Sequence, residues 1–147
     1  MTSIASIKNC LAQYMNSEAP QGHFLAVYVF GSFARNQERA KSDIDLAFFV
    51  DPEKYRRDAF ESTAPVHMLA AKMGMELNRV VDVTILNSAS LEMAYEIISG
   101  GECLFEIDPE ERLQYELKVK GMYFDFRPFI NELRRERLGL PSDYEFR

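Results

Sequence analysis

Three short apolar runs, rich in aromatic and β-branched residues, most constrain how this chain folds. They cover residues 24–30 (FLAVYVF), 44–50 (IDLAFFV) and 80–86 (VVDVTIL). Each run is flanked by glycine, proline, asparagine or aspartate, and this combination predicts a β-strand. Segments with helical periodicity lie before, between and after the three runs. The chain is therefore predicted to be an α+β protein, with helices packed on a small mixed β-sheet.

The other expected elements follow from helical periodicity and from capping residues. Asn87 and Ser88 are predicted to cap the helix that follows them. Asp108 and Pro109 are predicted to begin a C-terminal helical region, which Pro128 kinks or divides. The helices are expected at 3–16, 32–38, 66–78 and 89–98 and a fourth, edge strand at 102–106, with 53–63 either loop or helix.

Length and charge limit the number of domains and the kinds of partner. The 147 residues fit one domain, with a core at about 20–107 and a helical region at about 108–140. The net charge of −6 lies within residues 1–109, because residues 110–147 hold equal numbers of acidic and basic side chains. A nucleic-acid binder carries a basic face. We therefore expect no direct nucleic-acid partner, and an attraction for cations or for a basic protein.

Hydropathy gives an expectation for location. No apolar run reaches the roughly 18 residues that a bilayer-spanning helix needs. The first 20 residues lack the basic, apolar and small-residue order of a signal peptide. We expect a cytoplasmic protein with no membrane partner.

Three aspartates stand at or inside the predicted strands. Asp43 and Asp45 are one residue apart, so an extended chain points both side chains to the same face. Two such carboxylates repel each other unless one is protonated or a cation lies between them. Asp82 interrupts the third strand, where a lone buried carboxylate is unfavourable unless it is paired or bound to a metal. Arg79, the available ion-pair partner, is expected on the opposite face of that strand from Asp82.

If the strands are neighbours, the three carboxylates can converge. Oxygen donors in such an arrangement suit Mg²⁺. The alternatives are a solvated strand entrance for the first two acids and an ion pair for the third. Gly31 and Ser32 follow the first strand and precede a predicted helix, whose N-terminal N–H groups would suit a phosphate. The alternative for Ser32 is a simple helix N-cap.

The spacing of these residues resembles a known signature. Gly31-Ser32, ten further residues and Asp43-Ile44-Asp45 resemble the signature of the nucleotidyltransferase superfamily typified by DNA polymerase β. The context GSFAR…SDIDLAFF resembles most the minimal nucleotidyltransferases (MNT), which are usually encoded beside a HEPN-domain ribonuclease toxin and act as its antitoxin. By motif the resemblance covers residues 24–86, and it implies the polymerase β-like nucleotidyltransferase fold.

The resemblance also implies a role for each position. Gly31 and Ser32 would hold the β- and γ-phosphates of ATP. Asp43 and Asp45 would bind two Mg²⁺ ions. Asp82 would complete the metal site nearest the attacking hydroxyl and help to deprotonate it.

Two cations lie near the motif, and the loop contains one departure from the family pattern. Arg35 and Lys41 would meet the phosphates, or they would belong to a solvated charged loop. Asn36 stands where relatives often have glycine after the arginine. Asparagine also tolerates a left-handed backbone, so the departure is minor.

The function implied by the resemblance is Mg²⁺-dependent transfer of AMP from ATP to a tyrosine of a HEPN-family ribonuclease toxin. The protein would then be an antitoxin in a hetero-oligomer. Two alternatives remain open: a non-catalytic antitoxin that acts by binding, and a nucleotidyltransferase for small molecules such as aminoglycosides. The C-terminal region leaves a further choice, because its leucines and aromatic residues either pack on the sheet or dock a partner.

Overall fold

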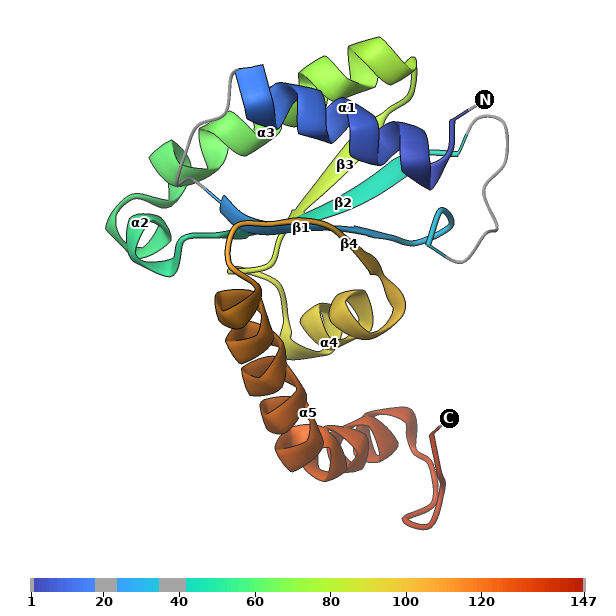
Figure 1. Ribbon diagram of the computed structural model, residues 1–147. Helices are drawn as coiled ribbons and strands as arrows, with labels where there is room; N and C mark the ends of the chain where they lie inside the picture. The colour runs from blue at the N-terminus through green and yellow to red at the C-terminus, as the bar shows by residue number, and fades with distance from the viewer. Residues whose placement is uncertain (1, 18–23, 35–41, 147) are drawn as a thin grey trace.

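The structure is a computed structural model that describes residues 2–17, 24–34 and 42–146 (Figure 1). In chain order, its elements are α1 Ile4–Ser17, β1 Phe24–Phe30, β2 Ile44–Val50, α2 Pro52–Arg57, α3 Ala59–Leu77, β3 Val81–Ile85, α4 Leu91–Gly100, β4 Glu102–Glu106 and α5 Pro109–Leu138.

The four strands form one mixed sheet in the order β3-β2-β1-β4. β1 pairs antiparallel with β2 and with β4, whereas β2 and β3 are parallel. Helices α1 and α3 cover one face of the sheet, and α4 and α5 lie on the other (Figure 1). The predicted fold class is confirmed, and so is the edge position of β4.

Alternation along β2 decides which side chains each face buries. Ile44 and Leu46 are 0% exposed and belong to a buried cluster with residues of α1 and α3. Ala47 and Phe49 belong to a second buried cluster with residues of α4 and α5. Asp45, between Ile44 and Leu46, therefore lies on the face that α4 and α5 cover, called the α4–α5 face below.

Helix α3 begins earlier than predicted. It starts at Ala59 rather than at residue 66, because Asp58 caps it by accepting a hydrogen bond from the Glu61 N–H at 3.0 Å. The helix continues through Pro65. Together with α2, it makes the charged segment at 53–63 helical apart from Asp58.

The predicted cap of α4 was wrong. Ser90, and not Ser88, caps this helix, and its hydroxyl accepts a hydrogen bond from the Met93 N–H at 3.1 Å. Asn87 has a different role, because its side chain bonds both the N–H and the C=O of Val50, at 2.9 and 2.8 Å. This pairing holds the 86–90 connection against the end of β2.

The predicted helix at 32–38 is not seen in its described part. Residues 31–34 form a turn directly after β1, and residues 35–38 lie outside the described residues. The predicted strands agree closely with the observed ones. The bounds of β1, β2 and β4 are those predicted, and β3 is shorter than predicted by one residue at each end.

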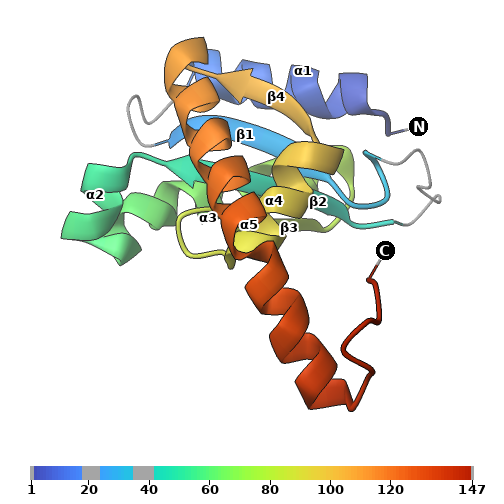
Figure 2. The same cartoon turned by 90° about the horizontal axis from the view of Figure 1, so that it is seen from below.

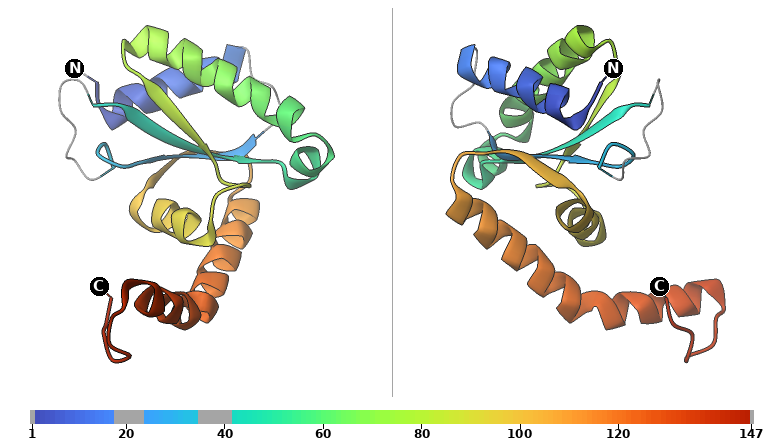
Figure 3. Two further views of the ribbon diagram at one scale, coloured as in Figure 1. Left: turned by 180° about the vertical axis from the view of Figure 1, so that it is seen from behind. Right: turned by 45° about the vertical axis from the view of Figure 1, so that its right-hand side comes forward.

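Helix α5 begins as predicted, with Asp108 as N-cap and Pro109 in the first turn. It is one helix with Pro128 inside it, and it bends in its middle (Figure 3). Its first half crosses the sheet beside α4 and its second half extends past the sheet (Figure 2). Within the described residues, no helix combines the length and the apolar character needed to cross a membrane.

The C-terminal region was predicted either to pack on the sheet or to dock a partner, and the two halves of α5 differ in this respect. In the first half, Val119 is buried and Tyr115 stacks on Phe49 with ring centroids 4.1 Å apart. In the second half, Phe126 is 49% and Phe129 is 60% exposed. Packing on the sheet therefore comes from the first half, although Leu113 and Leu117 there are also exposed, and the second half carries exposed aromatic side chains.

Candidate active site

The turn after β1 depends on Gly31. Its φ is +72°, in the left-handed region that glycine adopts without a steric penalty. A Cβ atom added there would overlap Oδ2 of Asp45 and would lie 3.2 Å from Cγ of the same residue. Gly31 is thus required twice, once by the backbone conformation and once by the close approach of the turn to Asp45.

The register of the sheet brings two of the three predicted acids together. Asp45 pairs with Phe30 on β1 and with Asp82 on β3. Adjacent strands are about 4.8 Å apart, and in-register neighbours project from the same face of a sheet. Asp45 and Asp82 therefore stand side by side on the α4–α5 face, beside the point where β1 ends. Asp43 immediately precedes β2 and is exposed.

Asp82 is not buried, so the burial predicted for it was wrong. β3 is an edge strand and Asp82 is exposed, so its carboxylate carries little desolvation penalty. Asp45 is half-buried between its two neighbouring strands. What distinguishes Asp82 is its register opposite Asp45, which places two like charges on adjacent strands.

The donor chemistry at this end of the sheet fits a hard divalent cation. Carboxylate oxygens come from β2, from β3 and from the residue before β2, and Mg²⁺ is bound by oxygen ligands. Among residues 2–17, 24–34 and 42–146, no three His, Cys, Asp or Glu side chains are already grouped to hold a metal. The strand register thus supplies the positions, while the side-chain orientations are not those of a closed metal site.

The remaining predicted residues divide between the turn and an undescribed segment. Ser32 lies in the turn beside Gly31 and is partly exposed. Within the described residues, its hydroxyl is therefore presented by a turn. Arg35 and Lys41 lie outside the described residues.

Sequence reasoning missed the part that Arg79 plays here. It lies between α3 and β3, and its Nη1 donates a hydrogen bond to the Ser42 carbonyl at 2.9 Å. Its guanidinium carbon also lies 5.4 Å from the centroid of the Phe33 ring. Strand alternation was applied to Arg79 although it precedes the strand. The position of Arg79, directly after the end of α3 and three residues before Asp82, would have been a better indication that it contacts the site.

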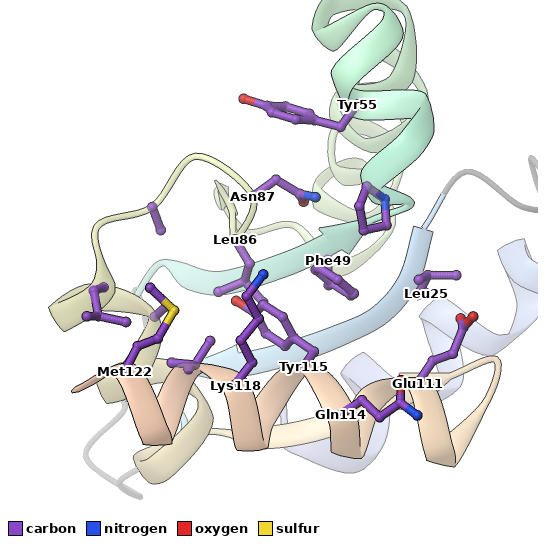
Figure 4. Close-up of a pocket in the computed structure, with 15 residues that line it drawn as sticks. Leu25, Phe49, Tyr55, Leu86, Asn87, Glu111, Gln114, Tyr115, Lys118 and Met122 are labelled. Atoms are coloured by element: carbon purple, nitrogen blue, oxygen red, sulfur yellow. The ribbon is translucent and has the colours of Figure 1, made fainter. Parts of the chain in front are cut away.

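A cleft occupies the opposite end of the same sheet face (Figure 4). It encloses about 630 Å³ and is mostly apolar, with Phe49, Leu86, Tyr115 and Met122 among its walls. Phe49 follows Asp45 by four residues, or about 13 Å along a strand. This cleft is therefore separate from the carboxylates, although it is a well-formed hollow on the molecule.

Polar contacts beside this cleft attach α5 to the sheet. The buried Tyr28 hydroxyl donates a hydrogen bond to Glu116 at 2.7 Å. Burial, then this hydrogen bond and the nearby negative charge, raise the pKa of Tyr28 above its usual value. Arg112 forms ion pairs with Glu106 at 2.5 Å and with Glu116 at 3.8 Å. These contacts fix the first half of α5, and so the wall of the cleft.

The chain matches the family model described as Polymerase beta, Nucleotidyltransferase over residues 7–110, which is more than half of its length. The matched range contains all four strands, the turn at 31–34 and the three aspartates. The predicted family and its fold are therefore confirmed.

A sequence relative and two solved structures extend this result. The chain is 28% identical over 117 residues to Protein adenylyltransferase MntA of Shewanella oneidensis, covering 80% of this chain and 73% of the relative. It resembles a toxin–antitoxin crystal structure with AMP-PNP, with a TM-score of 0.61, 21% identity, and 89% and 94% of the two chains covered. It also resembles a complex of tri-AMPylated Shewanella oneidensis HEPN toxin with MNT antitoxin, with a TM-score of 0.57, 19% identity, and 92% and 94% coverage.

Proposed function

The chain belongs to the polymerase beta nucleotidyltransferase family, and we propose that it transfers AMP from ATP to a tyrosine of a HEPN-family ribonuclease toxin. It would thereby act as the antitoxin of that partner, in a hetero-oligomer. The observation that carries the chemistry is the register of Asp45 opposite Asp82, with Gly31 packed against Asp45. The acceptor is proposed from the adenylyltransferase relative and from the AMPylated toxin in a structure of similar fold.

The proposed roles follow from the positions of the side chains. The backbone at Gly31 and the hydroxyl of Ser32 would bind the β- and γ-phosphates of ATP. Asp43, Asp45 and Asp82 would hold two Mg²⁺ ions. When bound, Mg²⁺ stabilises the charge that develops on the phosphate oxygens.

The reaction forms one bond and breaks another. The tyrosine oxygen of the acceptor bonds to the α-phosphorus of ATP, and the bond from that phosphorus to the bridging oxygen breaks, releasing pyrophosphate. Asp82 would accept the proton of the attacking hydroxyl. Its exposure on an edge strand suits this role, because a macromolecular acceptor can reach it. The net charge of −6 suits a basic ribonuclease as the partner.

The test combines the purified chain with the HEPN protein encoded beside it, ATP and Mg²⁺, followed by intact mass of the HEPN protein. We expect a gain of whole AMP units with the wild type and no gain with the double variant Asp43→Asn, Asp45→Asn. The control is the double variant Asp51→Asn, Asp58→Asn. It removes two charges from the N-caps of α2 and α3, where asparagine also caps well.

Binding without chemistry is the alternative that the same experiment can detect. It predicts no mass gain with the wild type, a stable complex, and ribonuclease inhibition that survives the Asp43→Asn, Asp45→Asn change. The uncovered aromatic side chains on the second half of α5 favour a protein partner under either reading. Mass gain on a small alcohol or aminoglycoside, with none on the HEPN protein, would instead indicate a small-molecule enzyme.

A further inference from the structure

Arg79 occupies a junction between three segments of the active site. Its backbone N–H bonds the Gly74 carbonyl at 3.1 Å, where α3 ends in a left-handed residue, Asn78. Directly after it, the Val80 carbonyl accepts the Ile44 N–H at 2.8 Å and so begins the pairing of β3 with β2. The base of the Arg79 side chain is therefore fixed on both sides by backbone hydrogen bonds.

The guanidinium group reaches the other two segments. It donates a hydrogen bond to the carbonyl of Ser42, the residue immediately before Asp43. Ser42 is 37 positions away from Arg79 in sequence. The guanidinium group also lies against the ring of Phe33, which belongs to the same turn as Gly31 and Ser32. Phe33 is 1% exposed, so the ring is held by the core and cannot easily move away from the guanidinium.

We propose that Arg79 is a positioning residue for nucleotidyl transfer, which holds the Gly-Ser turn and the backbone before Asp43 in one arrangement. This inference rests on the proposed function for its activity readout. A planar guanidinium can lie over an aromatic ring and donate a hydrogen bond in its own plane at the same time. A lysine ammonium keeps the charge but has no plane, so it cannot satisfy both contacts with the same geometry.

The test compares Arg79→Lys with the wild type in three measurements. We expect the melting temperature to change by no more than about 4 °C, since the charge and most of the side-chain volume remain. We expect AMP transfer to fall by about 10- to 100-fold, because small displacements of reacting groups have effects of this size. Calorimetry with ATP and Mg²⁺ should show weaker binding in the absence of the HEPN protein.

Two further variants separate positioning from general stability. Arg112→Lys is the matched control, because Arg112 also bridges two elements but does so beside β4 and α5. It should lower the melting temperature and leave AMP transfer by the folded protein unchanged. Phe33→Leu should reduce transfer in the wild type and add little in the Arg79→Lys background, since both changes remove the same contact.

The outcomes distinguish this inference from the proposed function. If the wild type transfers no AMP but binds ATP with Mg²⁺, the proposed function fails, and weaker binding by Arg79→Lys still supports the positioning role. Wild-type transfer and wild-type nucleotide binding by Arg79→Lys would overturn the inference. So would a loss of activity that only follows the loss of folded protein, or a wild type that binds no nucleotide.

Discussion

The two ends of the α4–α5 face differ in what their side chains do. Asp45 and Phe49 lie on the same strand and the same face, four residues apart. At the Phe49 end, an aromatic ring stacks on it and Asn87 satisfies both backbone groups of Val50. At the Asp45 end, a like charge stands opposite on the next strand and a left-handed glycine presses against the carboxylate.

The side chains at the Phe49 end of β2 therefore serve stability, and those at the Asp45 end serve the proposed chemistry. Like charges on adjacent strands are unfavourable to folding unless a bound cation or another partner compensates them. The left-handed conformation of Gly31 and its contact with Asp45 leave no room for a side chain at that position. Places where a chain departs from local rules are where functional sites are expected. Substitutions of the carboxylates at the Asp45 end should therefore change activity more than stability, and substitutions at the Phe49 end should change stability more than activity.

The largest combined effect, on activity and on stability together, is expected for Gly31→Ala. The added Cβ overlaps the Asp45 carboxylate, and the φ of +72° is strained for alanine, so both the turn and Asp45 must move. We expect AMP transfer to fall by about 100-fold or more and the free energy of unfolding to fall by about 1–3 kcal/mol. Intact-mass kinetics and urea unfolding measure the two quantities.

Gly100→Ala is the control for that substitution. A Cβ at Gly100, in the last turn of α4, meets no other atom within 4 Å. This variant should keep wild-type transfer and be unchanged or more stable, by up to about 1 kcal/mol. If the two glycine variants had the same AMP transfer and the same stability, the close approach of Gly31 to Asp45 would not matter for activity.

The second prediction concerns Asp82→Asn. It removes the charge opposite Asp45 and leaves a side chain of the same shape. We expect AMP transfer to fall by about 100- to 10,000-fold, as for the loss of a general base, while the urea midpoint is unchanged or slightly higher. A lower midpoint would mean that the pair stabilises the fold, and would contradict the expectation that these carboxylates affect activity more than stability.

The sequence predicted the strands better than it predicted the contacts between them. Aromatic and β-branched runs bounded by turn residues located β1 and β2 to the residue, and the bounds predicted for β4 are also those observed. The register of Asp45 with Asp82 depends on strand order, which is decided by packing between distant segments. The burial of Asp82 was misjudged for the same reason, because an edge strand and a central strand can have the same local pattern.

Local rules also left a choice between equivalent residues. Ser88 and Ser90 are both acceptable N-caps, and the pairing of Asn87 with Val50 delays the helix to the second of them. Strand alternation predicted that the Arg79 side chain lies on the opposite face from Asp82, but Arg79 precedes β3, so that rule does not apply to it. Its contacts with Ser42 and Phe33 join segments that no local pattern connects.

The third prediction compares two tyrosines on the α4–α5 face, Tyr28, which is buried, and Tyr115, which is partly buried. Tyr28→Phe removes the hydrogen bond to Glu116 and should lower the free energy of unfolding by about 1–2 kcal/mol. The hydroxyl of Tyr115 is buried and has no hydrogen-bond partner within the described part of the chain. Tyr115→Phe should therefore be neutral or stabilising, by up to about 1 kcal/mol. Urea unfolding measures both, and AMP transfer should stay at the wild-type level in each variant.

The smallest effect is a change in alkaline stability on Tyr115→Phe. Burial, and then the charge of Glu116, raise the pKa of Tyr115 from 10.0 to about 12. A group whose pKa is raised in the folded state contributes its full stability below the unfolded pKa and loses it as the pH rises through the folded one. The wild type should thus lose stability between about pH 10 and 12, and the phenylalanine variant should lose less, by on the order of 1 kcal/mol.

The measurement is urea unfolding at several values across that pH range. Tyr28 is present in both proteins, so its own titration cancels in the comparison. Tyr144→Phe, in the exposed tail, is the control for the loss of a tyrosine hydroxyl elsewhere in the chain. Identical curves for the wild type and Tyr115→Phe would mean that the Tyr115 hydroxyl reaches water. The Phe49 end would then be a solvated cleft wall, and the contrast with the Asp45 end would rest on charge alone.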